Sequence, residues 1–152
     1  MILDILIGLA FAFVGTVGCG IMFNAPKSEL LPGGINGAIG WLVYRLTVDL
    51  VGATPVFATL FAAIAITFVA KILTVQRRMP LSVFLTPGII MLAPGYYIYN
   101  TMYHLTIDEA YVAVGYGVET FKIAGGIAVG ILIVFTLFPV KTKPTPLKNI
   151  SK

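Results

Sequence analysis

Two proline–glycine pairs are the residues of this chain that are best placed to create a site for a polar molecule. The pairs are Pro87-Gly88 and Pro94-Gly95, seven residues apart in an otherwise apolar stretch. Proline has no backbone N–H and its ring clashes with a carbonyl of the preceding turn, so a helix kinks or breaks there. The exposed carbonyls and helix ends can then hold polar molecules and ions inside a membrane, and a helix N-terminus favours a carboxylate.

Four polar side chains follow these pairs at helical spacing. Their positions place them on one face of a helix, where they would offer hydroxyls and an amide: Tyr96, Tyr99, Asn100 and Tyr103. One interpretation is a binding surface beside the broken helix. The other is a belt of aromatic side chains at the membrane interface above a structural kink. Both interpretations stay open.

A less apolar segment upstream carries further candidates. Arg45 and Asp49 are four residues apart and therefore share a helix face, and Asn36 and Tyr44 lie in the same segment. Charge at bilayer depth is costly unless it faces protein or water. The segment therefore either lines a polar path, with Arg45 attracting a carboxylate and Asp49 coupling an ion, or carries a local ion pair near the lipid headgroups.

Glu119 and Lys122 form a second face-sharing pair, three residues apart. If their helix spans the membrane from about Ala110, Glu119 is a candidate group for proton coupling. If the helix starts near Gly117, both side chains lie at the outer surface. His104 is the only histidine, so no metal site is predicted, and no nucleotide-binding loop or base–nucleophile pair is present.

The composition shows which elements must position these groups. The chain has 152 residues, of which 59% are hydrophobic and only 11% charged. A soluble domain is about half apolar and a quarter charged. These values exclude a soluble enzyme, a nucleic-acid-binding protein and a disordered chain. The single Cys19 excludes an internal disulfide.

The hydropathy pattern predicts one all-α integral membrane domain with about five transmembrane helices. Five spans of about 20 residues would use most of the chain. The expected spans are 2–23, 35–52, 56–75, 81–102 and 110–140. The first is expected to be a retained helix, because no basic residue precedes its apolar run.

Prolines and length qualify this pattern at three places. Pro26 and Pro32-Gly33-Gly34 are expected to interrupt any helix before the second span. The fourth span should be kinked, broken or re-entrant. The last stretch is too long for one straight crossing, so it should project, tilt or bend at Gly125-Gly126.

The basic residues predict the orientation of the domain. Lys27 lies between spans one and two, a cluster that includes Arg77 and Arg78 lies between spans three and four, and four lysines follow span five. With five crossings all of these fall on one side, which the positive-inside rule makes cytoplasmic. The expected arrangement is therefore N-terminus out and C-terminus in, with a transmembrane domain over 1–140 and a mobile, basic cytoplasmic tail over 141–152.

Several short motifs, in this order, resemble the threonine/serine exporter family. They are Phe23-Asn24-Ala25-Pro26, then Gly37-Ala38-Ile39-Gly40-Trp41-Leu42-Val43-Tyr44, then Pro80-Leu81-Ser82-Val83-Phe84 leading into the two proline–glycine pairs and Tyr99. The resemblance is to the short-subunit type, which corresponds to the C-terminal half of longer one-chain exporters, and it covers about residues 1–140. One departure is Met91 with Ala93, where the family often reads Pro-Leu-Val-Pro-Gly, so this stretch should be less broken here.

The resemblance implies a secondary exporter in the cytoplasmic membrane. Relatives are associated with export of threonine and serine, and some with a dicarboxylate such as succinate. The short subunit is expected to work by alternating access with a separate larger membrane subunit, without a cofactor, and it could also form a homo-oligomer. An odd number of spans would invert the two halves relative to each other, which places the expected substrate site at their junction. The competing interpretation is a non-transporting structural or regulatory subunit that stabilises the larger partner.

Overall fold

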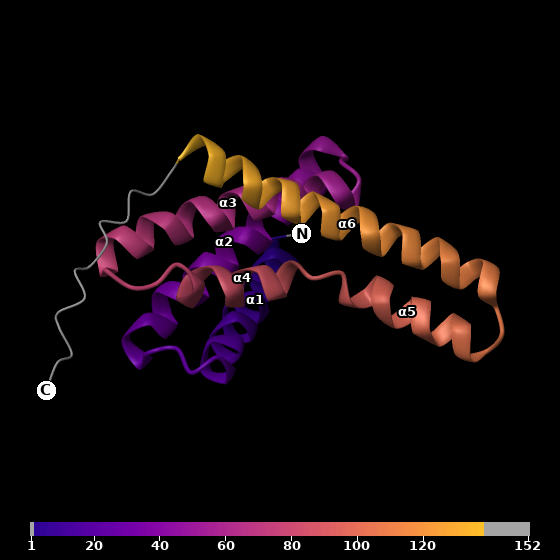
Figure 1. Ribbon diagram of the computed structural model, residues 1–152, viewed down its shortest axis with the longest axis horizontal. Helices are drawn as coiled ribbons and strands as arrows, with labels where there is room; N and C mark the ends of the chain where they lie inside the picture. The colour runs from indigo at the N-terminus through magenta and orange to yellow at the C-terminus, as the bar shows by residue number, and fades with distance from the viewer. Residues whose placement is uncertain (1, 139–152) are drawn as a thin grey trace, which may run out of the picture.

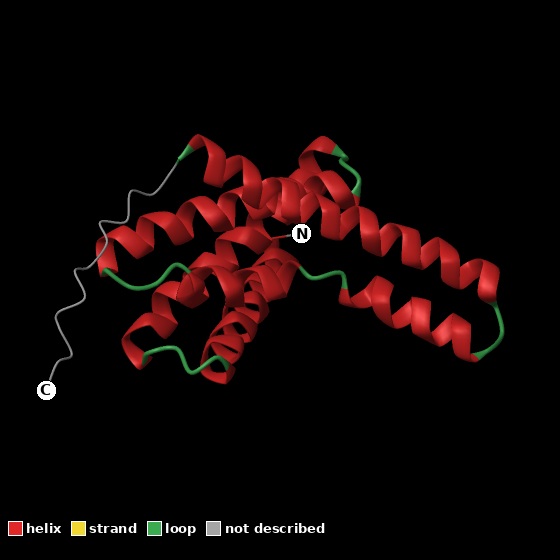
Figure 2. Cartoon of the chain, viewed as in Figure 1, coloured by secondary structure: helices red, strands yellow, loops and turns green. Residues whose placement is uncertain are grey.

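The computed structural model describes residues 2–138, and these form six α-helices without a strand (Figures 1 and 2). The helices are α1 (Ile2–Met22), α2 (Lys27–Val51), α3 (Pro55–Arg77), α4 (Ser82–Leu92), α5 (Gly95–Thr106) and α6 (Ala110–Leu137). The predicted all-helical architecture is confirmed for this part of the chain. The expected tail at 141–152 lies outside the described residues.

Three of the described helices, α1, α3 and α6, are long and apolar enough to cross a membrane. α4 and α5 taken together are also long and apolar enough to cross a membrane, although the two helices are bent by 49° at their break. α2 has 25 residues but is less apolar, because Arg45, Asp49, Lys27 and Glu29 all lie within it. Length and composition therefore support three spans, or four with the bent pair, among the described residues.

The start of α2 differs from the expectation. The predicted interruption at Pro32-Gly33-Gly34 is wrong, because α2 begins at Lys27 and continues through all three residues. Pro32 is the sixth residue of α2, so it removes one backbone bond, the one to the carbonyl of Ser28, and the helix continues around it. Gly34 instead permits close packing on α1: a β-carbon there would lie 2.6 Å from Cε2 of Phe13.

α2, α3 and α4 meet at a tightly packed point around Ile66 of α3. A β-carbon at Gly40 of α2 would lie 2.2 Å from Cδ1 of Ile66, and one at Gly88 of α4 would lie 2.8 Å from its Cγ2. Ile66 is fully buried. Two glycines from different helices thus pack against one isoleucine. The first proline–glycine pair, Pro87-Gly88, lies inside a continuous α4, and the chain breaks only at the second pair, Pro94-Gly95.

α3 and α6 pack side by side and run parallel, in a defined register. A β-carbon at Gly126 would lie 3.0 Å from the carbonyl oxygen of Val56, and one at Gly130 would lie 2.8 Å from that of Leu60. α6 is one helix through Gly126. Because Gly126 already faces the first turn of α3, the preceding part of α6 extends past the end of α3 and packs on α5. Figure 1 shows this α5–α6 hairpin projecting beyond the other helices.

Candidate functional site

A cavity of about 260 Å³ lies where α2, α3 and α6 meet the break between α4 and α5. It is the place where helices far apart in the sequence converge on the second proline–glycine pair. Its walls combine aromatic, small and apolar side chains: Trp41, Tyr44, Pro55, Thr59, Met91, Leu92, Ala93, Pro94, Gly95, Tyr96, Tyr97 and Ile123.

The break that forms one wall follows from local backbone chemistry. α4 ends at Leu92, and its last turn closes with a bond from the Ala93 N–H to the Ile90 carbonyl at 3.1 Å. Pro94 has no N–H with which to continue the ladder. Gly95 then begins α5 with its N–H bound to the Ala93 carbonyl at 2.7 Å.

The first turn of α5 presents a helix N-terminus to the cavity. This end has no side-chain cap, and N–H groups of a first turn have no intrahelical acceptor. The same residues, Gly95, Tyr96 and Tyr97, belong to the cavity wall. The aligned peptide dipoles make this end partly positive, so it favours a carboxylate without a charged side chain.

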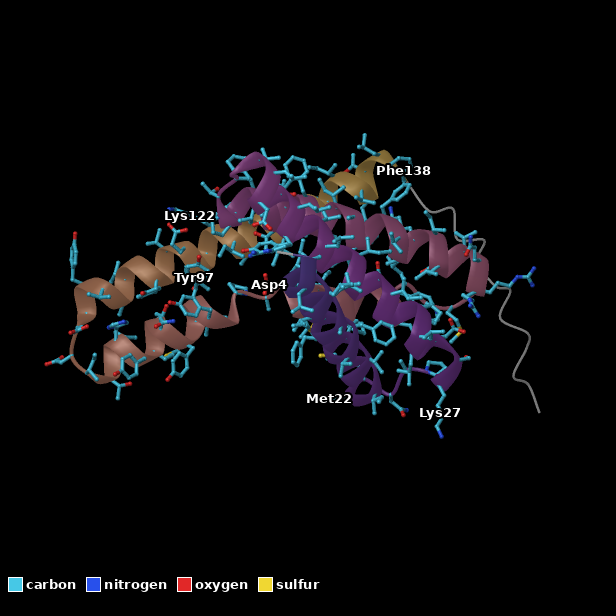
Figure 3. All side chains as sticks on the ribbon, turned by 180° about the vertical axis from the view of Figure 1, so that it is seen from behind. Asp4, Met22, Lys27, Tyr97, Lys122 and Phe138 are labelled. Carbon is cyan, nitrogen blue, oxygen red and sulfur yellow. The ribbon has the colours of Figure 1, made fainter. Side chains whose placement is uncertain are left out.

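The residues that line the wall include no Asp, Glu, Lys, Arg or His, and most of its polar groups are aromatic. Tyr44, Tyr96 and Tyr97 contribute phenol groups, and Trp41 contributes an indole. The Tyr96 and Tyr97 rings contact each other edge to face at 5.4 Å, and both pack on Tyr116 of α6. Figure 3 shows Tyr97 directed from α5 toward α6. The ring contacts hold the phenols in place where α5 leaves the bundle.

Only part of the predicted site contributes to this wall. Tyr44, Pro94, Gly95 and Tyr96 line the cavity, whereas Tyr99, Asn100 and Tyr103 do not. The face that enters the cavity is therefore rotated from the predicted one. Sequence reasoning did not include several lining residues, among them Tyr97, Thr59 and Ile123, because the last two read as ordinary residues of apolar spans.

The remaining α5 candidates interact along their own helix. The rings of Tyr99 and Tyr103 stack with centroids 6.2 Å apart, and both side chains are exposed. Asn100 donates from Nδ2 to the carbonyl of Tyr96 at 2.8 Å. His104 follows the expected fourth span, 81–102, and lies in α5, where its ring stacks on Tyr116.

The predicted ionic candidates form local pairs outside the cavity. Nε of Arg45 lies 3.0 Å from Oδ2 of Asp49, and their side chains are 44% and 30% exposed. Nζ of Lys122 lies 2.7 Å from Oε1 of Glu119. Figure 3 shows Lys122 on the outer side of α6. Pairs at this spacing on one helix stabilise it only slightly.

Asn36, Pro87 and Gly88 lie deeper, at the contact of α2 with α4. All three are buried, and Nδ2 of Asn36 donates to the carbonyl of Phe84 at 3.1 Å.

A second cavity of about 180 Å³ lies at the start of α4, beside the turn that joins α1 to α2. Its walls are Phe23, Asn24, Ala25, Pro26, Ser82, Val83 and Thr86. We call it the inner cavity and the first one the outer cavity.

The most deeply buried charges were not site candidates. Lys71 is 5% exposed and donates from Nζ to the carbonyls of Val134 at 2.9 Å and Phe138 at 2.6 Å. Glu29 is 6% exposed, and its Oε2 lies 3.9 Å from Nε of Arg77. The polarity of Lys71 inside an apolar span was the available signal for its tertiary role.

A family model described as Threonine/Serine exporter, ThrE, matches residues 8–137. No curated protein and no solved structure matches the chain. The matched segment contains both cavities, the broken α4–α5 pair and nearly all of the six helices. This agrees with the resemblance carried by the sequence motifs and with the apolar, membrane-spanning composition. The chain therefore belongs to the threonine/serine exporter family of membrane transport proteins.

Proposed function

We propose that this chain is a subunit of a secondary exporter of small amino acids, such as threonine and serine, or of small carboxylates. The observation that carries the proposal is the outer cavity, where the N-terminus of α5 and three phenols converge at a broken span. Amino acids and small carboxylates share the carboxylate that a helix N-terminus favours. A volume of about 260 Å³ suits a ligand smaller than those that fill typical drug-sized pockets of about 300–1,000 Å³.

The proposal includes a five-span topology in the cytoplasmic membrane. α2 would cross as well, because it packs between α1 and α3. The turns at Asn24 and Arg78 would then lie on the cytoplasmic side together with the basic residues. The α2–α3 turn and the α5–α6 hairpin would lie outside, so the outer cavity would face the exterior and the inner cavity the cytoplasm.

The two cavities support transport by alternating access. α4 lines both of them: Ser82, Val83 and Thr86 face the inner cavity, and Met91 and Leu92 face the outer one. The packed point around Ile66 lies between these levels. On this proposal the structure would represent a closed state, in which a change at the Ala93–Pro94 break would move the two walls relative to each other.

Partner and coupling ion belong to the same proposal. A larger membrane subunit of the family would complete the route, with the substrate site at the junction of the two chains. Asp49 and Glu119 stay predictions for ion coupling. Each carboxylate is paired with a basic side chain on its own helix.

The test is counterflow of labelled threonine, serine and succinate in vesicles that contain the chain with its larger subunit. Tyr97→Phe removes one cavity phenol, and Tyr99→Phe removes a phenol of the same helix outside the cavity. Loss of one hydrogen bond should raise the half-saturating substrate concentration by about two- to tenfold for Tyr97→Phe. Tyr99→Phe should change it little.

Three outcomes would contradict the proposal. Absence of counterflow for all three substrates with both subunits present would refute the transport role. Equal effects of the two tyrosine variants would remove the outer cavity from the substrate route. Full export by the chain alone would refute the junction with a larger subunit.

A structural or regulatory role is the second candidate. The α5–α6 hairpin supports it, because Tyr111 and Phe121 are 94% and 82% exposed and could contact a larger membrane subunit. If this role is correct, cavity variants should alter the amount of assembled complex and leave its substrate preference unchanged.

A further inference from the structure

Between the two cavities, α2 and α4 enclose a polar group that none of the helices satisfies. We propose that the amide oxygen of Asn36 is part of a binding site for a small cation, either a sodium ion or the ammonium group of an amino acid. The route between the cavities rests on the proposed function. The binding itself can be measured without transport.

Asn36 has a fixed orientation and one unused acceptor. Its side chain is fully buried, Nδ2 donates to the carbonyl of Phe84 at 3.1 Å, and Oδ1 has no hydrogen-bond partner. The Phe84 carbonyl can only accept, so the amide nitrogen must face it and Oδ1 must point elsewhere. A buried acceptor without a donor is costly, and such a group calls for a function or a missing ligand.

Pro87 deprives a second acceptor, on the neighbouring helix, of its usual donor. It lies inside α4, where its missing N–H leaves the carbonyl of Val83, four residues earlier, without its helical donor. Val83 belongs to the wall of the inner cavity. The turn of α4 that contacts Asn36 therefore carries a carbonyl that can also accept a hydrogen bond or bind an ion.

Gly88 allows the two helices to approach at this level. A β-carbon there would lie 3.4 Å from Nδ2 of Asn36 and 2.8 Å from Cγ2 of Ile66. The groups that meet here are neutral, and the atoms that lack a partner or a usual donor are oxygens. Neutral oxygens bind hard cations and ammonium donors and repel carboxylates. The site thus complements the N-terminus of α5 in the outer cavity, which favours negative charge.

The position of Asn36 between the two cavities would give the site a role in the passage of a cation. A cation that passes between the cavities must shed water where Ile66 fills the space between Gly40 and Gly88. Oδ1 of Asn36 can replace part of that hydration. The same oxygen serves an ion or an ammonium group, because both need acceptors of this kind.

Ligand-dependent thermal unfolding of the purified full chain in detergent tests the site. One arm titrates sodium chloride against choline chloride without amino acid. The other arm titrates threonine in choline chloride and compares it with 3-hydroxybutyrate, which lacks the ammonium group. Stabilisation in the first arm identifies a sodium ion, and stabilisation by threonine but not by 3-hydroxybutyrate identifies the ammonium group.

Asn36→Ala should weaken the stabilising ligand by about tenfold or more, because a contact to a charged group is lost. Asn36→Asp loses the bond to the Phe84 carbonyl but keeps an oxygen and adds a negative charge, so it should bind the cation at least as well. The matched control is Thr67→Val, since Thr67 is also buried but its hydroxyl already donates to Ala63 of its own helix at 2.7 Å. This variant should retain the wild-type affinity.

The proposal is overturned if neither ligand stabilises the wild-type chain, or if Asn36→Ala binds as tightly as wild type. If Asn36→Ala does not fold, weaker binding by Asn36→Asp overturns it. Cation binding that depends on Asn36 without any counterflow would contradict the proposed function and leave the site intact. Counterflow without Asn36-dependent binding would contradict the cation site and leave the proposed function intact.

Discussion

Replacing Lys71 by methionine tests how a buried ammonium group stabilises the end of another helix. Lys71 lies on α3, and its Nζ donates to two carbonyls at the C-terminus of α6, those of Val134 and Phe138. It also lies 4.2 Å from the centroid of the Phe135 ring. The last turn of α6 has no basic residue of its own, so Lys71 supplies the positive charge that a helix C-terminus favours.

The size of the effect follows from opposing contributions. Each hydrogen bond to a charged group is worth about 1.5–3 kcal/mol, and a desolvated cation–π contact adds about 2 kcal/mol. Removing the ammonium group also removes its desolvation cost of several kcal/mol. The Val134 carbonyl keeps a second donor, the N–H of Phe138 at 3.1 Å. We therefore expect Lys71→Met to destabilise the last turn of α6 by about 1–3 kcal/mol, or about 5- to 150-fold in its opening equilibrium.

Hydrogen exchange of the full chain in detergent, read by mass spectrometry over residues 131–138, measures this opening. The control is Lys122→Met on the same helix, because the pair of Lys122 with Glu119 is exposed and worth about 0.2–1 kcal/mol at most. Lys122→Met should leave exchange over 131–138 unchanged. Unchanged exchange in Lys71→Met would refute the role given to the buried ammonium group.

Two further predictions concern helix packing and topology. Gly130→Leu should separate α3 from α6 and lower the melting temperature in detergent, because a β-carbon there already meets the Leu60 carbonyl at 2.8 Å. The control is Gly125→Leu, whose side chain would point into open space and should be tolerated. Equal melting temperatures of the two variants would contradict the packing. In a chain that lacks Cys19, a membrane-impermeant thiol reagent applied to whole cells should label a cysteine at Ala53 and not one at Asn24. The reverse labelling, or labelling of both, would refute the five-span orientation.

The parts of the fold that could be predicted depend on local properties of the chain. A long apolar run forms a helix in a bilayer, because a helix satisfies its own backbone groups, so the helices around Phe11, Ile66 and Ile131 were predictable. Pro94 was predicted to be a place where the chain kinks or breaks, and α4 and α5 are bent by 49° there. Pro32 shows the limit, because it lies inside α2 without ending the helix, so a proline alone does not decide where a helix begins or ends.

The parts that could not be predicted depend on contacts between distant segments. The spacing of the polar residues in α5 predicts a polar helix face, but it does not predict the direction in which that face points. The packing of Tyr96 and Tyr97 on Tyr116 of α6 decides which phenols enter the outer cavity. Likewise the acceptor of Lys71 in Val134 is 63 residues away, so no spacing rule could connect the two.

The unequal lengths of α3 and α6 link this chain to the thickness of its bilayer. At 1.5 Å per residue, the 23 residues of α3 reach about 34 Å and the 28 residues of α6 about 42 Å, against a hydrocarbon layer of about 30 Å. Gly126 and Lys71 join the two helices near both ends of their contact, so neither can tilt alone. Longer acyl chains would therefore draw the projecting hairpin into the lipid, and shorter ones would release it into water. Membrane composition would thereby act on the bend beside the outer cavity.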